Sequence, residues 1–251
     1  MDAIVDALGQ EQAELAGLLA GLDGDDWHQA SPCPGWDIAD VVLHLAQTNE
    51  LAIGSASGRF DEALARLASG LGSGRDVDDG AARMVARERE QAPSETRARW
   101  RRGADDLLTL LRHADPHRRV EWVAGQLSVH TLTATRLAET WIHTGDVAAA
   151  LGKTIEPTSR LRHVARLAWR TLPYAFARSN RELAGPVAFE LSSPSGDSWD
   201  FAPDARPLTV IRGTAVDLCL VAARRVRRDE TGLRGTGPDA NAVLDLVRTY
   251  A

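Results

Sequence analysis

The sequence predicts a mainly α-helical protein, with a four-helix bundle over residues 1–152 followed by a smaller α+β domain over residues 158–251. Four long segments before residue 152 repeat apolar residues at the helical spacing of three and four. After Pro157 the pattern changes to short apolar runs separated by Pro, Ser and Gly, which is typical of strands and turns. With 251 residues, 44% of them hydrophobic, both domains can bury a core.

The first two helices of the bundle are separated by a turn-rich stretch. The first helix is expected over Val5–Leu22, where Gly24 provides a natural stop. After the turns, Asp37 can accept hydrogen bonds from the free N–H groups of a second helix that runs to about Gly54. Residues 55–93 have a weaker pattern, with helical patches at 60–71 and 81–90 around a Gly/Asp-rich loop.

The third and fourth helices each begin after a serine. Ser94 is expected to cap the third helix, which should end near Pro116. Ser128 is expected to cap the fourth helix, which extends through Leu151 and is closed by Gly152. These helices complete the count for a four-helix bundle.

The C-terminal domain mixes helices and strands. A helix is expected over 161–177, and the run PVAFELSSPSGDSWDFAP then predicts a β-hairpin around its Ser-Pro-Ser-Gly turn. Leu208–Arg212 is a candidate strand, and Val216–Arg228 is a candidate helix with four arginines at its end. A last helix is expected over Pro238–Tyr250.

Charge and hydrophobicity exclude several classes of partner. The net charge of −6 has no basic excess, so nucleic acid is not expected as a partner. No apolar run approaches eighteen residues and the first 22 residues lack a basic signal-peptide start, so we expect a cytoplasmic protein without a membrane partner. In that reducing compartment Cys33 and Cys219 are expected to be free thiols.

One group of residues has the pattern of a metal site. Glu139 and His143 are four residues apart on the fourth helix, so their side chains project from the same face. The inward arc of the second helix, formed by Val41, Leu45, Thr48 and Leu51, also contains His44. Two His and one Glu with a vacant fourth position form a ligand set of catalytic zinc sites. The spacing alone is more often explained by a His–Glu hydrogen bond and a core histidine, so the metal site and this simpler interpretation both stay open.

Two nearby residues have open roles. Asp146, one turn beyond His143, either accepts the second ring N–H of that imidazole or balances local charge on the helix. Cys33 lies in the turn before the second helix, where it either approaches the metal as a thiolate or packs as a small apolar side chain.

Two segments, SPCPGWDIADVVLHL and RLAETWIHTGDVAAALG, are similar to those of the mycothiol-dependent maleylpyruvate isomerase family, within the DinB-like group of metal-binding four-helix bundles. The resemblance spans most of residues 1–152 and, more loosely, the C-terminal domain. It implies that His44, Glu139 and His143 are the metal ligands. It also implies a divalent metal, with zinc expected, although the same ligands accept nickel, iron or manganese.

The resemblance further implies an enzyme that holds a low-molecular-weight thiol, mycothiol, at the open position of the metal. A zinc-bound thiol loses its proton and can add to a small electrophilic substrate. Addition, bond rotation and elimination give isomerisation, whereas a retained adduct gives S-transfer. In the family an arginine of the C-terminal domain binds a substrate carboxylate; Arg224 or Arg225 matches it, but the following DETGLRGTGPD departs from the family pattern and leaves the substrate open.

Two other functions remain compatible with the same ligands. The first is a metal enzyme of specialised metabolism that needs no thiol, in which water or the substrate occupies the open position. The second is a non-catalytic metal-binding protein, which four protein ligands and no exchangeable water would indicate.

Overall fold

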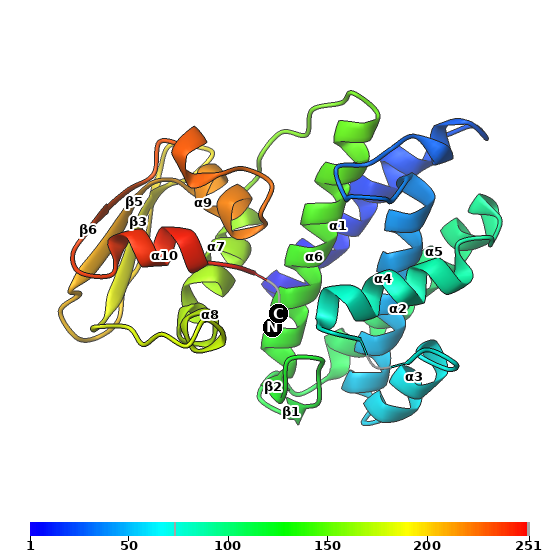
Figure 1. The fold of residues 1–251 in the computed structure, drawn as a ribbon, viewed down its shortest axis with the longest axis horizontal. Coiled ribbons are helices and arrows are strands. Elements are labelled where there is room, and N and C mark those ends of the chain that lie inside the picture. The colour runs from blue at the N-terminus through cyan, green and yellow to red at the C-terminus, as the bar shows by residue number, and fades with distance from the viewer. Residues whose placement is uncertain (73, 250–251) are drawn as a thin grey trace. The chain divides into compact units, whose positions relative to one another are not determined.

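Four long helices build the first unit of the protein. In the computed structural model this unit covers Met1–Ile155, and a second unit begins at Glu156. The structure describes residues 1–72 and 74–249. The four helices are α1 (Asp2–Ala20), α2 (Ile38–Ala56), α5 (Pro93–His113) and α6 (Val129–Ala150). Both α1 and α2 pack against α5 and α6, so the four helices enclose a common core (Figure 1).

Side chains at the helix starts explain where α2 and α6 begin. Asp37 and Asp40 form a capping box, in which each carboxylate accepts a hydrogen bond from the backbone N–H of the other residue. The Ser128 hydroxyl accepts a hydrogen bond from the Thr131 N–H at 3.1 Å. Both predicted caps are therefore confirmed.

The predicted cap of α5 is wrong. The helix begins one residue earlier than Ser94, with Ala92 at the N-cap position and Pro93 in the first turn. Proline has no N–H to satisfy and its fixed φ suits the first turn of a helix, so Pro93 starts α5 without a side-chain cap.

Short elements connect the long helices. They are the 3-10 turn η1 (Asp26–His28), the helices α3 (Phe60–Leu67) and α4 (Val77–Glu88), and the paired strands β1 (Arg119–Val120) and β2 (Leu127–Ser128). Helix α4 begins before the predicted residue 81, because the Asp76 carboxylate caps it by accepting a hydrogen bond from the Asp79 N–H. The sequence pattern did not indicate the β1–β2 pair.

The second unit begins with two helices where one was predicted. They are α7 (Leu161–Arg170) and α8 (Leu172–Arg178), and they meet at Thr171. Pro173 explains the break, because it cannot donate a backbone hydrogen bond to a carbonyl of the preceding turn and its ring would collide with that turn.

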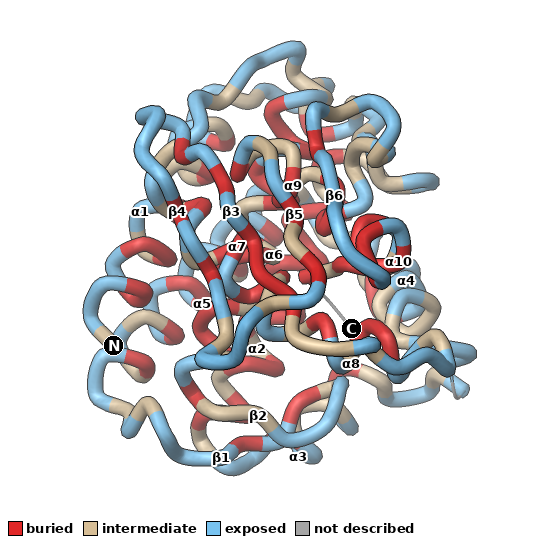
Figure 2. Tube along the Cα trace, turned by 90° about the vertical axis from the view of Figure 1, so that its left-hand side faces the viewer, coloured by how far each residue is buried: buried red, intermediate tan, exposed pale blue. Residues whose placement is uncertain are grey.

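The sheet of the second unit has the strand order β4–β3–β5–β6. The predicted hairpin is confirmed as β3 (Val187–Ser192) and β4 (Ser198–Phe201), while β5 (Thr209–Thr214) runs parallel to β3 and β6 (Arg234–Thr236) antiparallel to β5. Strand β3 is mostly buried and β6 is exposed (Figure 2). Helices α7, α9 and α10 contact the sheet.

The last two helices are shorter than predicted. Helix α9 covers only Ala215–Ala222, because the chain leaves the helix at Arg224, whose φ of 59° lies in the left-handed region. The Arg224 N–H donates to the Val221 carbonyl and the Arg225 N–H donates to the Leu220 carbonyl, which is the Schellman pattern of a helix end. The arginines therefore follow α9 and do not form its last turn.

Helix α10 covers Ala240–Leu246, so Pro238 precedes it and is not in its first turn. The predicted end of this helix, Tyr250, lies outside the described residues. Within residues 1–72 and 74–249, none of the helices has the length and apolar character that crossing a membrane requires. The predicted fold class, a helical N-terminal part followed by a smaller α+β part, is confirmed.

Candidate metal centre

Helices α2 and α6 bring three predicted ligands together. The Nε2 atom of His44 lies 2.9 Å from Oε1 of Glu139, and Nε2 of His143 lies 3.4 Å from the same oxygen. His44 projects from α2, whereas Glu139 and His143 are one turn apart on α6. The contact between these two helices, which spacing along the chain could not establish, therefore creates the cluster.

The cluster is buried but not sealed. Each imidazole has 8% of its side-chain area exposed, whereas the Glu139 side chain keeps 18% exposed. The Glu139 carboxylate is therefore the part of the cluster that is most open to solvent. A site closed by protein on every side would suit a structural metal better than a reactive one.

The donor atoms fit the requirements of a divalent metal. Two nitrogens and one carboxylate oxygen lie within 4.8 Å of one another. Zinc bonds of about 2.0–2.1 Å at tetrahedral angles place neighbouring donors about 3.3 Å apart, close to the two distances found here. One feature costs stability: Nδ1 of His44 is buried and has no hydrogen-bond partner among the described residues.

The pKa shifts of the three side chains make Glu139 an anion, His143 a cation and His44 a neutral ring. Burial by itself raises the pKa of Glu139, but hydrogen bonds from His143 and His44 outweigh it and hold that pKa well below its usual range. Burial lowers the pKa of His143, yet its hydrogen bonds to Asp146, Cys33 and Glu139 raise that pKa well above 6.5. For His44, burial dominates and the pKa is lowered.

A second layer of contacts holds the His143 ring. Its Nδ1 atom lies 2.9 Å from Oδ2 of Asp146, which is the first of the two roles considered for this carboxylate. The Cys33 thiol donates a hydrogen bond to the same Oδ2 at 3.2 Å. Cys33 is thus more than a packing residue, because it contacts the partner of a candidate ligand.

Trp36 covers both imidazoles, a role that the sequence analysis missed. Its ring centroid lies 5.2 Å from that of His44 and 6.5 Å from that of His143. The turn that carries it is fixed by hydrogen bonds between the backbones of Ser31 and Trp36 and of Trp36 and Cys33. The sequence signal was present, since Trp36 belongs to the CPGW turn beside the His44 helix.

Arg136 is the other residue that the sequence analysis missed. It is 1% exposed, it donates a hydrogen bond to Oδ1 of Asn49 at 3.2 Å, and its Nε has no hydrogen-bond partner among the described residues. Burial lowers its pKa to about 10, which still leaves it charged at neutral pH. Its spacing of three and seven residues before Glu139 and His143 was the available signal, because it places all three on one helix face.

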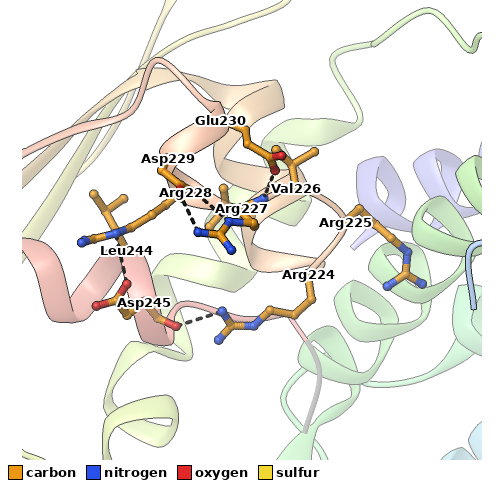
Figure 3. A pocket seen from close by; sticks show the side chains of 10 residues that line it. Arg224, Arg225, Val226, Arg227, Arg228, Asp229, Glu230, Leu244 and Asp245 are labelled. Carbon is orange, nitrogen blue, oxygen red and sulfur yellow. Dashed lines mark hydrogen bonds and ion pairs between the residues drawn. The ribbon is translucent and has the colours of Figure 1, made fainter. Parts of the chain in front are cut away.

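The structure places Arg224 and Arg225 in the loop after α9, beside a pocket of about 510 Å³ within the second unit (Figure 3). A nitrogen of Arg224 donates to the Asp245 carbonyl, and Nη1 of Arg225 donates to the Ala223 carbonyl. Other arginines of this pocket are paired with acids; for example, Arg227 pairs with an aspartate two residues away. The proposed role of Arg224 or Arg225 in binding a substrate stays a prediction.

Comparison with known proteins finds relatives that match nearly the whole chain. Two uncharacterized proteins of Mycobacterium tuberculosis, from strains CDC 1551 and H37Rv, are 32% identical to the chain over 97% of its length and 93% of theirs. The crystal structure of the mycothiol-dependent maleylpyruvate isomerase superposes with a TM-score of 0.59 at 16% identity, over 94% of this chain and 92% of that one. A histidine-to-alanine variant of that enzyme gives a TM-score of 0.60 with the same identity and coverage.

The family model described as the mycothiol maleylpyruvate isomerase N-terminal domain matches residues 8–148, which include all three clustered residues. The match covers more than half of the chain and contains the whole first motif of the resemblance and residues 136–148 of the second. The chain therefore belongs to the mycothiol maleylpyruvate isomerase family.

Proposed function

We propose that this protein is a cytoplasmic enzyme that binds one divalent metal ion, zinc, through His44, Glu139 and His143. It uses mycothiol or a similar small thiol to isomerise an electrophilic small molecule, or it transfers the whole thiol to that molecule through its sulfur (S-transfer). The observation that carries the proposal is the convergence of three donor atoms from two helices on one partly open point. Membership in a family described by mycothiol and maleylpyruvate isomerase supports the choice of thiol and reaction.

The residues of the cluster have separate tasks in this proposal. His44 and Glu139 hold the ion from opposite helices, and His143 completes the set while its other ring nitrogen faces Asp146. When bound, zinc supplies positive charge that favours the thiolate form of a thiol at the open position. The Trp36 ring covers one flank of the imidazoles and excludes water there.

The proposal also includes an arginine of the second unit that binds a carboxylate group of the substrate. The family resemblance assigns binding of a substrate carboxylate to an arginine of the C-terminal domain, and Arg224 or Arg225, each of which follows α9, is the candidate for it. We expect Arg224→Ala or Arg225→Ala to raise the KM of a carboxylate substrate about tenfold or more, with metal content unchanged, since a charged hydrogen bond contributes about 1.5–3 kcal/mol. Equal KM values for both variants and the wild type would remove this assignment.

Metal analysis of the purified protein beside a His44→Ala variant tests the site. His113→Ala is the matched control, because His113 is an exposed histidine on α5 whose Nδ1 lies 2.8 Å from a backbone carbonyl. We expect about one zinc per chain for the wild type and the control, and little for His44→Ala. Equal metal in all three proteins would show that the proposed ligands are wrong.

Calorimetry with mycothiol then tests the thiol. We expect the zinc-loaded protein to bind it and the His44→Ala variant to lose that binding. Full turnover of a substrate without any thiol would refute the mycothiol requirement and leave the metal site intact.

A further inference from the structure

Three side chains form a continuous line of contacts outside the candidate ligand set. The Cys33 thiol donates to Oδ2 of Asp146 at 3.2 Å, and Nδ1 of His143 lies 2.9 Å from that same oxygen. The Cys33 sulfur is also 3.9 Å from Nδ1 of His143. The line thus runs from the turn before α2 to the ring of a residue on α6, 110 positions later in the chain.

We propose that Cys33 is a positioning residue for the metal centre, because its thiol holds the Asp146 carboxylate in the orientation that aims Nε2 of His143 at the metal. This inference rests on the proposed function, in which His143 is a ligand. It assigns a role to a cysteine that does not itself contact the ion.

The orientation of the Asp146 carboxylate is important because this side chain is buried. This residue is 2% exposed, and a buried carboxylate oxygen needs hydrogen-bond donors in place of water. With Oδ2 facing Nδ1, that nitrogen of His143 keeps its hydrogen, so Nε2, which lies 3.4 Å from Oε1 of Glu139, is the nitrogen that would give up its proton and hold the ion. A thiol that donates to the same oxygen favours the rotamer in which Oδ2 points to the ring.

The backbone around Cys33 fixes the position of its sulfur. Its N–H donates to the Ser31 hydroxyl at 3.1 Å, and its carbonyl accepts from the Trp36 N–H at 3.0 Å. Gly35 completes the turn with a φ of 78°, a conformation that favours glycine. The turn that places Trp36 over the imidazoles therefore also places the thiol beside Asp146.

Direct coordination by Cys33 is the competing arrangement, because its sulfur, Nδ1 of His143 and Asp146 also lie within 4.8 Å of one another. The observed orientation favours the positioning role. Nε2 of His143 faces Glu139 and His44, whereas coordination beside Cys33 would use Nδ1 and forfeit its contact with the Asp146 carboxylate. The spectrum of bound cobalt in Cys33 variants separates the two arrangements.

The test compares four variants of the full chain, loaded with zinc alone or cobalt alone. Cys33→Ser keeps a hydroxyl donor and Cys33→Ala removes the donor, while Asp146→Asn replaces the carboxylate. Cys219→Ala is the matched control, because Cys219 is a buried thiol of the second unit whose sulfur contacts the Leu161 carbonyl.

We expect zinc affinity to fall about threefold to tenfold in Cys33→Ala, to stay within about twofold in Cys33→Ser, and to fall about 10- to 100-fold in Asp146→Asn. The control should match the wild type. The visible d–d bands of bound cobalt, which report ligand geometry, should shift in Cys33→Ala and return in Cys33→Ser.

Several results would overturn the inference. A sulfur-to-cobalt charge-transfer band near the ultraviolet edge that vanishes in Cys33→Ser would make Cys33 a ligand. Wild-type zinc affinity and cobalt spectra in Cys33→Ala would show that the thiol has no influence on the metal centre. If His44→Ala still lost the metal in that case, the proposed metal site would stand without the role of Cys33. Zinc binding that is absent from the wild type, or unaffected by His44→Ala, would overturn both proposals.

Discussion

The protonation state of His143 predicts that metal uptake at the proposed site releases a proton. In the metal-free protein, burial disfavours its charge, but its hydrogen bonds to Asp146, Cys33 and Glu139 raise its pKa well above 6.5. The ring is therefore protonated at pH 7, and a metal ion must displace the proton on Nε2. His44 has a lowered pKa, mainly because it is buried, and Glu139 has a pKa well below its usual range. Neither releases a proton at this pH.

The structure thus predicts the release of about one proton for each zinc ion bound at pH 7. Below the pKa of His143, the apparent affinity should rise about tenfold, or about 1.4 kcal/mol, for each unit of pH. Calorimetry in two buffers with different ionisation enthalpies counts the protons directly. In the Asp146→Asn variant, which lacks the charged partner of the ring, the count at pH 7 should fall below one.

The raised pKa of His143 also makes the stability of the metal-free protein depend on pH, in the direction opposite to that of the metal affinity. A histidine that binds its proton more tightly when folded adds stability that is complete below pH 6.5 and is lost as pH rises through its folded pKa. Zinc should therefore raise Tm by an increasing amount as pH increases above 6.5. Release of no protons or of two, or a zinc-induced shift in Tm that shrinks with pH, would refute this assignment of charges.

Other residues give further predictions. Ser128→Ala should lower the free energy of unfolding in a urea titration by about 1 kcal/mol through loss of the α6 cap, whereas Ser94→Ala, which removes no cap, should change it little. Trp36→Ala should cost about 2 kcal/mol in the same titration, since a half-buried ring that contacts both imidazoles is lost; an unchanged midpoint would mean that the ring does not pack there in solution. Arg136→Met should strengthen zinc binding about tenfold in competition titrations, because it removes a buried positive charge that interacts with Glu139, a proposed ligand. Weaker binding would show that the guanidinium supports the site through its contact with Asn49.

Local chemistry made much of the first unit predictable. Asp37 and Ser128 cap their helices through hydrogen bonds that span only three residues, so the signal lies within one short segment. The i, i+4 spacing of Glu139 and His143 likewise determines that they share a helix face. Two of the errors occurred where proline or a left-handed residue ended a helix early, at Pro173 and Arg224.

The sequence by itself determined the helix faces, two of the caps and the identity of the three candidate ligands. Only the tertiary structure decided which atoms meet: the 2.9 Å approach of His44 to Glu139 depends on how α2 packs against α6. The same packing buries Arg136 and brings the thiol of Cys33 to Asp146, 113 residues away. Periodicity describes one element at a time, whereas these contacts depend on side chains from two elements, and for that reason spacing along the chain could not reveal them.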